Sequence, residues 1–115
     1  MKTPLETAEL IQTAIGALGK EGERSLDLIQ SKAKAVSEYD RVMGLATANL
    51  KAEGMAATLI DKIAKERCHK ALYDKIVAEE TLKAHYCRLS TLESQLNGLQ
   101  SMNRYLQSTS RSENL

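Results

Sequence analysis

The sequence contains no phenylalanine and no tryptophan, and its four tyrosines are its only aromatic residues. Large aromatic side chains each bury about 150–250 Å² and commonly fill the core of a globular α/β domain. Without them, a core must be built from leucine, isoleucine, valine, methionine and alanine. Thin aliphatic seams of this kind suit contacts between helices, so the composition favours an all-α bundle or hairpin.

The sequence also lacks an excess of one charge and any long apolar run. Its 16 basic and 15 acidic residues leave a net charge of +1, so no whole-chain field attracts nucleic acid or anionic lipid. No apolar run approaches the roughly 20 residues of a membrane helix, and the N-terminal residues lack the apolar stretch of a signal peptide. We therefore expect a soluble, unsecreted, cytoplasmic protein without a membrane partner.

Patterns typical of catalytic and metal sites are missing as well. Cys68 and Cys87 lie about 28 Å apart along one expected helix, too far for a disulfide within the chain. A zinc site with His69 and His85 would require two antiparallel chains, because neighbouring residues diverge by about 100° around a helix. No serine or cysteine has the setting of an activated nucleophile. We predict no catalytic residues, no metal and no cofactor, and hence no enzyme.

The most regular feature that is present is a heptad seam in the C-terminal third of the chain. Its leucine phase continues through Asn97-Gly98, so we predict a helix rather than a turn at that pair. Asn103 takes a seam position where leucine is expected and would fix register or partner number. His85 takes another, and its protonation would loosen the association. The predicted oligomer interface consists of Leu82, His85, Leu89, Leu92, Leu96, Leu99, Asn103 and Leu106.

Start and stop signals predict two helices in the first half of the chain. A short helix over 4–18 begins at a capping box formed by Thr3 and Glu6 and ends at Gly19. A second helix spans 23–53. The predicted buried face of the first helix is Ala8, Ile11, Ile15 and Leu18, widened by Leu10 and Ala14. In the second helix it is Ile29, Val36, Met43 and Leu50, with Leu28, Ala35, Tyr39, Val42 and Ala46 beside them.

A third helix is predicted over 59–106, following a stop at Gly54 and a capping box at Thr58. A charged run near 65–68 interrupts its apolar pattern, and we favour a short helix followed by a long one at this point. Residues 1–108 would form a single helical domain, and 109–115 a disordered tail.

The second and third helices are joined by a few residues and should fold back as an antiparallel hairpin. The third helix outreaches the second, and the first is too short to cover the remaining seam. Each fully buried leucine left in water would forfeit roughly 1.5–3 kcal/mol. We therefore expect a coiled-coil-like helical bundle of several chains, with a homodimer favoured.

The densest group of basic residues lies early in the third predicted helix, where acidic residues interrupt it. Such a run is more often a solvated helix face than a phosphate-binding surface, so nucleic-acid contact is possible but not favoured. The residues that would make the contact are Lys62, Lys65, Arg67, Lys70 and Lys75.

Four segments carry a resemblance to known proteins: residues 50–60 (LKAEGMAATLI), Ala64-Lys65, 77–79 (VAE) and 92–101 (LESQLNGLQS). In these segments the chain resembles a family of small helical phage and prophage proteins. The resemblance implies a phage accessory protein encoded among early genes of DNA replication and recombination, near annealing recombinases and single-strand binding proteins. It implies no site residues, because the family has no defined site.

The function expected from these patterns is that of a non-enzymatic, phage-encoded helical interaction protein. Its partner would be a phage or host protein of DNA metabolism or host defence, on which it would act as an accessory factor or an inhibitor. The alternatives are a direct nucleic-acid-binding accessory protein that uses the basic residues of 62–75, or an oligomeric sponge for a signalling nucleotide.

Overall fold

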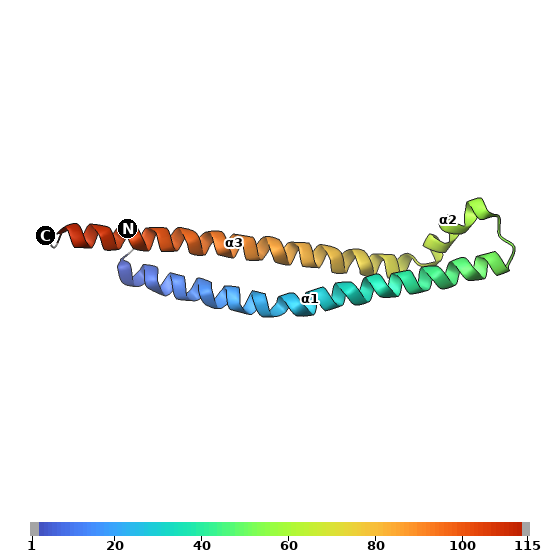
Figure 1. The fold of residues 1–115 in the computed structure, drawn as a ribbon, viewed down its shortest axis with the longest axis horizontal. Coiled ribbons are helices and arrows are strands. Elements are labelled where there is room, and N and C mark those ends of the chain that lie inside the picture. Colours follow the sequence, from blue (N-terminus) through green and yellow to red (C-terminus); the bar gives the residue numbers. More distant parts are fainter. Residues whose placement is uncertain (1–2, 114–115) are drawn as a thin grey trace. The chain divides into compact units, whose positions relative to one another are not determined.

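The computed structural model describes residues 3–113, which form three helices and no strand. These are α1 (Pro4–Ala52), α2 (Ala57–Arg67) and α3 (His69–Glu113). Helix α1 packs against α3 as an antiparallel hairpin (Figure 1). The predicted all-α class and hairpin are confirmed. None of the described helices has a stretch long and apolar enough to cross a membrane.

Helix α1 is continuous from Pro4 to Ala52, so the predicted separate helices over 4–18 and 23–53 are wrong. A glycine stops a helix by adopting a positive φ, and Gly19 does not do so. Each interior glycine costs about 1 kcal/mol relative to alanine, but packing of a buried face outweighs such local preferences. The buried residues Ala14 and Glu21 lie on either side of Gly19 and hold α1 in helical phase across it.

Both ends of α1 follow their local sequence signals. The amide of Thr3 donates to Glu6 Oε2 and the amide of Glu6 donates to Thr3 Oγ1, each at 3.1 Å, which confirms the capping box. At the other end Gly54 has a φ of 80°. The amide of Gly54 donates to the carbonyl of Lys51 at 3.1 Å, and the amide of Met55 donates to the carbonyl of Leu50 at 3.0 Å. This is a Schellman motif, and the predicted stop is confirmed.

Helix α2 begins without the side-chain cap predicted at Thr58. Its N-cap is Ala56, which makes no side-chain cap hydrogen bond, and Thr58 lies inside the first turn. The predicted pause near 65–68 is confirmed, because Cys68 leaves helical geometry with φ −103° and ψ 18°. Its amide still bonds to the carbonyl of Ala64 and its carbonyl accepts from the amide of Leu72, each at 3.0 Å, so the break spans one residue.

Helix α3 runs without interruption through Asn97-Gly98, as predicted, and continues to Glu113. The predicted tail is therefore wrong over 109–113, while 114–115 lie outside the described residues. Buried Leu106 holds this end of the helix in its packing, and Thr109 Oγ1 donates to the carbonyl of Tyr105 at 3.1 Å. A side-chain hydroxyl bonded to the preceding turn is compatible with helix, so polar composition alone did not end it.

The chain divides into two compact units. The terminal unit comprises Met1–Ser25 with Ala84–Leu115, in which the start of α1 lies beside the end of α3 (Figure 1). The central unit comprises Leu26–Lys83 and contains all of α2. Its core is the cluster of Leu50, Ile60 and Ala64, against which Met43, Ala46, Met55 and Ile63 pack.

The face that α1 buries in the terminal unit differs from the predicted one. Ile15, expected inside, has 53% of its surface exposed, and Ala8 is also exposed. The face that is buried or half-buried consists of Thr7, Ile11, Ala14, Leu18, Glu21 and Ser25, spaced alternately by four and three residues. The prediction is confirmed for Ile11, Ala14 and Leu18 and wrong for Ala8, Leu10 and Ile15. Apolar character alone could not find the other three residues of the buried face, because they are polar.

Candidate functional site

The predicted interface residues of α3 are covered within the single chain. Leu82, His85 and Leu106 are buried, and the other five are half-buried: Leu89, Leu92, Leu96, Leu99 and Asn103. In the terminal unit the seam has α1 beside it, because α1 does not break at Gly19 (Figure 1). The expectation that a short first helix leaves this seam without a neighbour in its own chain was therefore wrong, while five of its residues stay partly exposed. A contact between these residues and a second chain stays a prediction.

Polar side chains interrupt the seam of the terminal unit at one level, which we call the polar layer: Glu21, Ser25, His85 and Arg88. The side chain of His85 is 3% exposed and that of Glu21 is 11% exposed. The two ring nitrogens of His85 contact different partners on α1. Nε2 lies 2.7 Å from Ser25 Oγ, and Nδ1 lies 3.2 Å from Glu21 Oε2.

The carboxylate of Glu21 lies between a buried and an exposed partner. Its Oε1 is 3.0 Å from Arg88 Nε, and the Arg88 side chain is 66% exposed. Its Oε2 is fully buried and has no hydrogen bond of good geometry in the described part of the chain, although His85 Nδ1 is within ion-pair distance. A buried carboxylate is costly unless it is paired. Glu21 therefore depends on both Arg88 and His85.

Ser25, His85 and Glu21 follow each other in the order of a hydrolase triad, with contacts of 2.7 and 3.2 Å. The setting differs from that of an active site in two respects. Ser25 lies inside α1, where backbone amides bond to carbonyls one turn earlier and cannot form an oxyanion hole. The imidazole is also nearly inaccessible to a substrate. We interpret the polar layer as a structural element of the hairpin.

Sequence reasoning identified only His85 in this layer and missed its partners. The predicted helices over 4–18 and 23–53 leave Glu21 in the connection and Ser25 in the first turn of the second helix, and neither residue is assigned to a buried face. A signal was available, because both continue the alternating spacing of Thr7, Ile11, Ala14 and Leu18. Reading α1 as one helix would have placed them on its buried face.

The basic residues of 62–75 lie in the central unit, and three of the five have partners. Lys65 Nζ is 3.1 Å from Asp61 Oδ2, and Arg67 is 3.7 Å from Glu53 Oε2. The hydrogen bond to Asp61 raises the pKa of Lys65. Lys75 Nζ lies 4.9 Å from the ring centroid of Tyr39. Lys62 and Lys70 are exposed.

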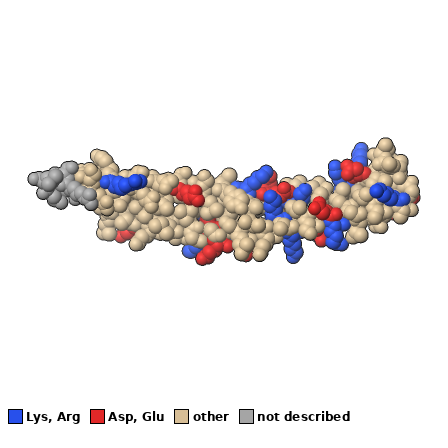
Figure 2. Space-filling view, in the orientation of Figure 1, with Lys and Arg blue, Asp and Glu red and all other residues tan. Residues whose placement is uncertain are grey.

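Acidic side chains thus accompany the basic ones over α2 and the adjoining part of α3. Figure 2 shows blue and red atoms intermixed over this region. Phosphate binding draws its affinity from uncompensated positive charge. The local arrangement is that of a mixed, solvated surface.

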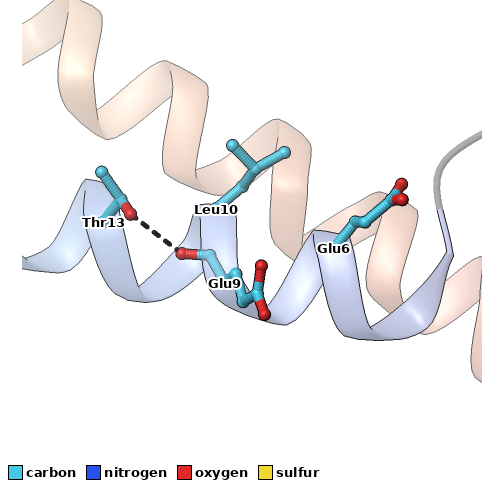
Figure 3. Close-up of a pocket in the computed structure, with 4 residues that line it drawn as sticks. All are labelled: Glu6, Glu9, Leu10 and Thr13. Carbon is cyan, nitrogen blue, oxygen red and sulfur yellow. Dashed lines mark hydrogen bonds between the residues drawn. The ribbon is translucent and has the colours of Figure 1, made fainter.

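A shallow depression lies on the first turns of α1, lined by Glu6, Glu9, Leu10 and Thr13. All four belong to one helix, and Thr13 Oγ1 donates to the carbonyl of Glu9 at 3.0 Å (Figure 3). Ligand pockets usually bury most of a ligand between converging elements. This depression has only one helix as its wall and is an ordinary surface groove.

The central unit exposes a second apolar stripe on α1, which we call the outer stripe: Leu26, Ile29, Ala33 and Val36. Leu26 is 61% exposed and Ile29 is 43% exposed, while Ala33 is exposed and Val36 half-buried. The last three line a groove together with Lys32, Ser37 and Asp40. Successive members are three, four and three residues apart, the spacing at which one helix packs against another.

The remaining chemistry is sparse. Cys68 is buried, Cys87 is exposed, and both are free thiols. In the described range 3–113, no group of three or more His, Cys, Asp or Glu side chains could hold a metal ion. Comparison with models of protein families, with curated proteins and with solved structures finds no match to this chain.

Proposed function

We propose that this chain is a non-enzymatic interaction protein that binds an α-helix of a partner protein along the outer stripe. The observation that carries the proposal is the exposure of Leu26 and Ile29 within a stripe that has helix-packing spacing. Single exposed apolar residues are common on protein surfaces, whereas contiguous apolar patches mark interaction sites.

The chemistry of the stripe specifies the kind of partner. A helix with aliphatic side chains at heptad spacing would place them against Ile29, Ala33 and Val36, with the small Ala33 allowing close approach. Covering the exposed halves of Leu26 and Ile29 would contribute roughly 1.5–3 kcal/mol in total. Lys32 and Asp40 line the same groove and would orient the partner through its charges.

The experiment is site-specific photo-crosslinking with a control on the same helix. A photoreactive residue replaces Leu26 or Ile29 in two versions of the chain, and Asp27 in the control. Asp27 is exposed but points about 100° away from Leu26 around α1. We expect the same partner protein to be linked from both stripe positions and not from position 27.

A substitution tests the same surface without a photoreactive group. Ile29→Glu should abolish recovery of that partner and change the free energy of unfolding by no more than about 0.5 kcal/mol, because the residue is exposed. Asp27→Lys should leave recovery unchanged. Equal crosslinking from positions 26, 29 and 27, or recovery that survives Ile29→Glu, would refute the outer stripe as the binding surface.

On the strength of the resemblance described above, we propose a partner among phage or host proteins of DNA metabolism or host defence. The alternative of direct nucleic-acid binding rests on Lys62 and Lys70, which among the five predicted contact residues are exposed and lack a described partner. A mobility shift of DNA that weakens with salt and disappears in Lys62→Glu/Lys70→Glu would favour it. A nucleotide sponge would instead show a thermal shift with the nucleotide.

A further inference from the structure

We propose that the polar layer is a proton-uptake switch, in which the Ser25 hydroxyl reverses its hydrogen bond so that His85 stays buried in both its neutral and its protonated form. The layer lies in the terminal unit, apart from the outer stripe, so the two proposals stand or fall separately. Histidine is the side chain that gains its charge between about pH 8 and 5. A buried histidine remains packed only if its surroundings can pair with both forms.

The surroundings of the neutral ring favour one tautomer. A proton on Nδ1 lies beside Glu21 Oε2, 3.2 Å away at ion-pair distance but outside hydrogen-bond geometry, and bare Nε2 accepts the hydroxyl proton of Ser25 at 2.7 Å. In the opposite tautomer, Nδ1 is unprotonated and its lone pair faces the buried, negatively charged Oε2 of Glu21, which repels it. The geometry therefore assigns the Nδ1–H tautomer to neutral His85.

The protonated ring is satisfied by rotation of one hydroxyl. After a proton from solvent reaches Nε2, that nitrogen donates to Ser25 Oγ instead of accepting from it. The Ser25 hydroxyl then turns its own proton to the main-chain carbonyl of Glu21, which lies 3.4 Å from Oγ. Nδ1–H keeps its place at ion-pair distance from Glu21 Oε2, and Nε2–H and the Ser25 hydroxyl each have an acceptor.

The charge of the layer changes with the proton. Helix α1 contributes Glu21 and Ser25, and α3 contributes Arg88 together with the Tyr86 ring, whose centroid lies 5.9 Å from that of His85. With a neutral imidazole, Glu21 and Arg88 sum to zero charge; with the imidazolium the sum is +1. Because Arg88 is 66% exposed, the surplus charge is presented at the surface beside it. Acidification thus adds a positive site to the hairpin without opening it.

The test is a nitrogen NMR titration of the full-length chain carrying His69→Gln, which removes the other histidine. We expect the neutral ring to carry its proton on Nδ1, and the ring protonated by acidification to carry protons on both nitrogens. The amides of α3 around His85 should keep their protection from hydrogen exchange in both forms. A proton on Nε2 in the neutral ring, or loss of that protection when the ring is protonated, would overturn the proposal.

Substitutions of Ser25 separate the switch from simple packing. Ser25→Ala removes the acceptor that the charged ring needs, so its unfolding midpoint should fall further below wild type at pH 5.5 than at pH 7.5. We expect the difference to be roughly 3–8 °C, the size that the loss of one buried hydrogen bond produces. Ser25→Thr keeps the hydroxyl and should restore the wild-type pH response. Equal losses at both pH values, or no restoration by threonine, would contradict a reversing hydroxyl.

Discussion

Truncation of Leu50 should be the most damaging single change in the central unit. Its side chain is fully buried, and it packs in one cluster with Ile60 and Ala64 of α2. Leu50→Ala removes three carbon atoms, worth about 0.8 kcal/mol each in transfer free energy, or roughly 2.4 kcal/mol. The cavity adds to this, because Leu50 also belongs to the Schellman turn and cannot shift freely. We expect a loss of about 3–4 kcal/mol in the free energy of unfolding, within the range measured for buried leucines.

Urea unfolding followed by circular dichroism measures this loss, with Leu45→Ala as the matched control. Leu45 lies on the same helix and is 53% exposed, so its truncation should cost less than about 1 kcal/mol. Amide exchange would locate the damage, since protection should fall first in α2, which Leu50 anchors. A Leu50→Ala loss below about 1 kcal/mol, or one equal to that of Leu45→Ala, would refute the assignment of this cluster as the core.

Three further predictions concern turns, caps and surface charge. Gly54→Ala should lower the free energy of unfolding by about 1–2 kcal/mol, because φ is 80° at this position. Gly44→Ala should raise it by about 0.5–1 kcal/mol, because a Cβ at this helical position meets open space. Thermal unfolding of the two variants should therefore show shifts of opposite sign. Thr3→Ala should cost about 0.5–2 kcal/mol and raise amide exchange in the first turn of α1, and unchanged exchange would contradict the cap. The hydrogen bond from Arg41 lowers the pKa of Glu38 below its ordinary 4.5, so any stability it adds is present above that value and lost as pH falls through the lowered one. An NMR titration should show the Glu38 carboxyl moving back toward 4.5 in Arg41→Ala.

Features that depend on neighbours in the sequence were predicted correctly. The capping box joins Thr3 to Glu6, and the stop at Gly54 involves the carbonyls of Lys51 and Leu50. Each motif spans only a few residues, and its geometry depends on those residues alone. The break at Cys68 is visible for the same reason, because the apolar repeat changes there.

Local signals also misled where packing opposed them. Gly19 resembles a helix stop, but α1 continues because residues on both sides of it are buried. Thr58 resembles a cap, yet α2 begins at Ala57 with no side-chain cap. The polar end of α3 resembles a tail, but it remains helical to Glu113. Intrinsic preferences of about 1 kcal/mol or less per residue cannot resist the burial of a helix face.

By itself, then, the sequence determined that the chain is helical, where α1 begins and ends, and where α2 and α3 separate. Only the tertiary structure decided which stripe of α1 is buried, and that Glu21 and Ser25 lie on it while Ile15 and Ile29 lie outside. The physical reason is that the burial of these residues depends on contacts with residues far away in the sequence. Ser25 meets His85 across 60 residues, and a polar side chain is tolerated inside a helical seam only when such a partner is there to pair with it.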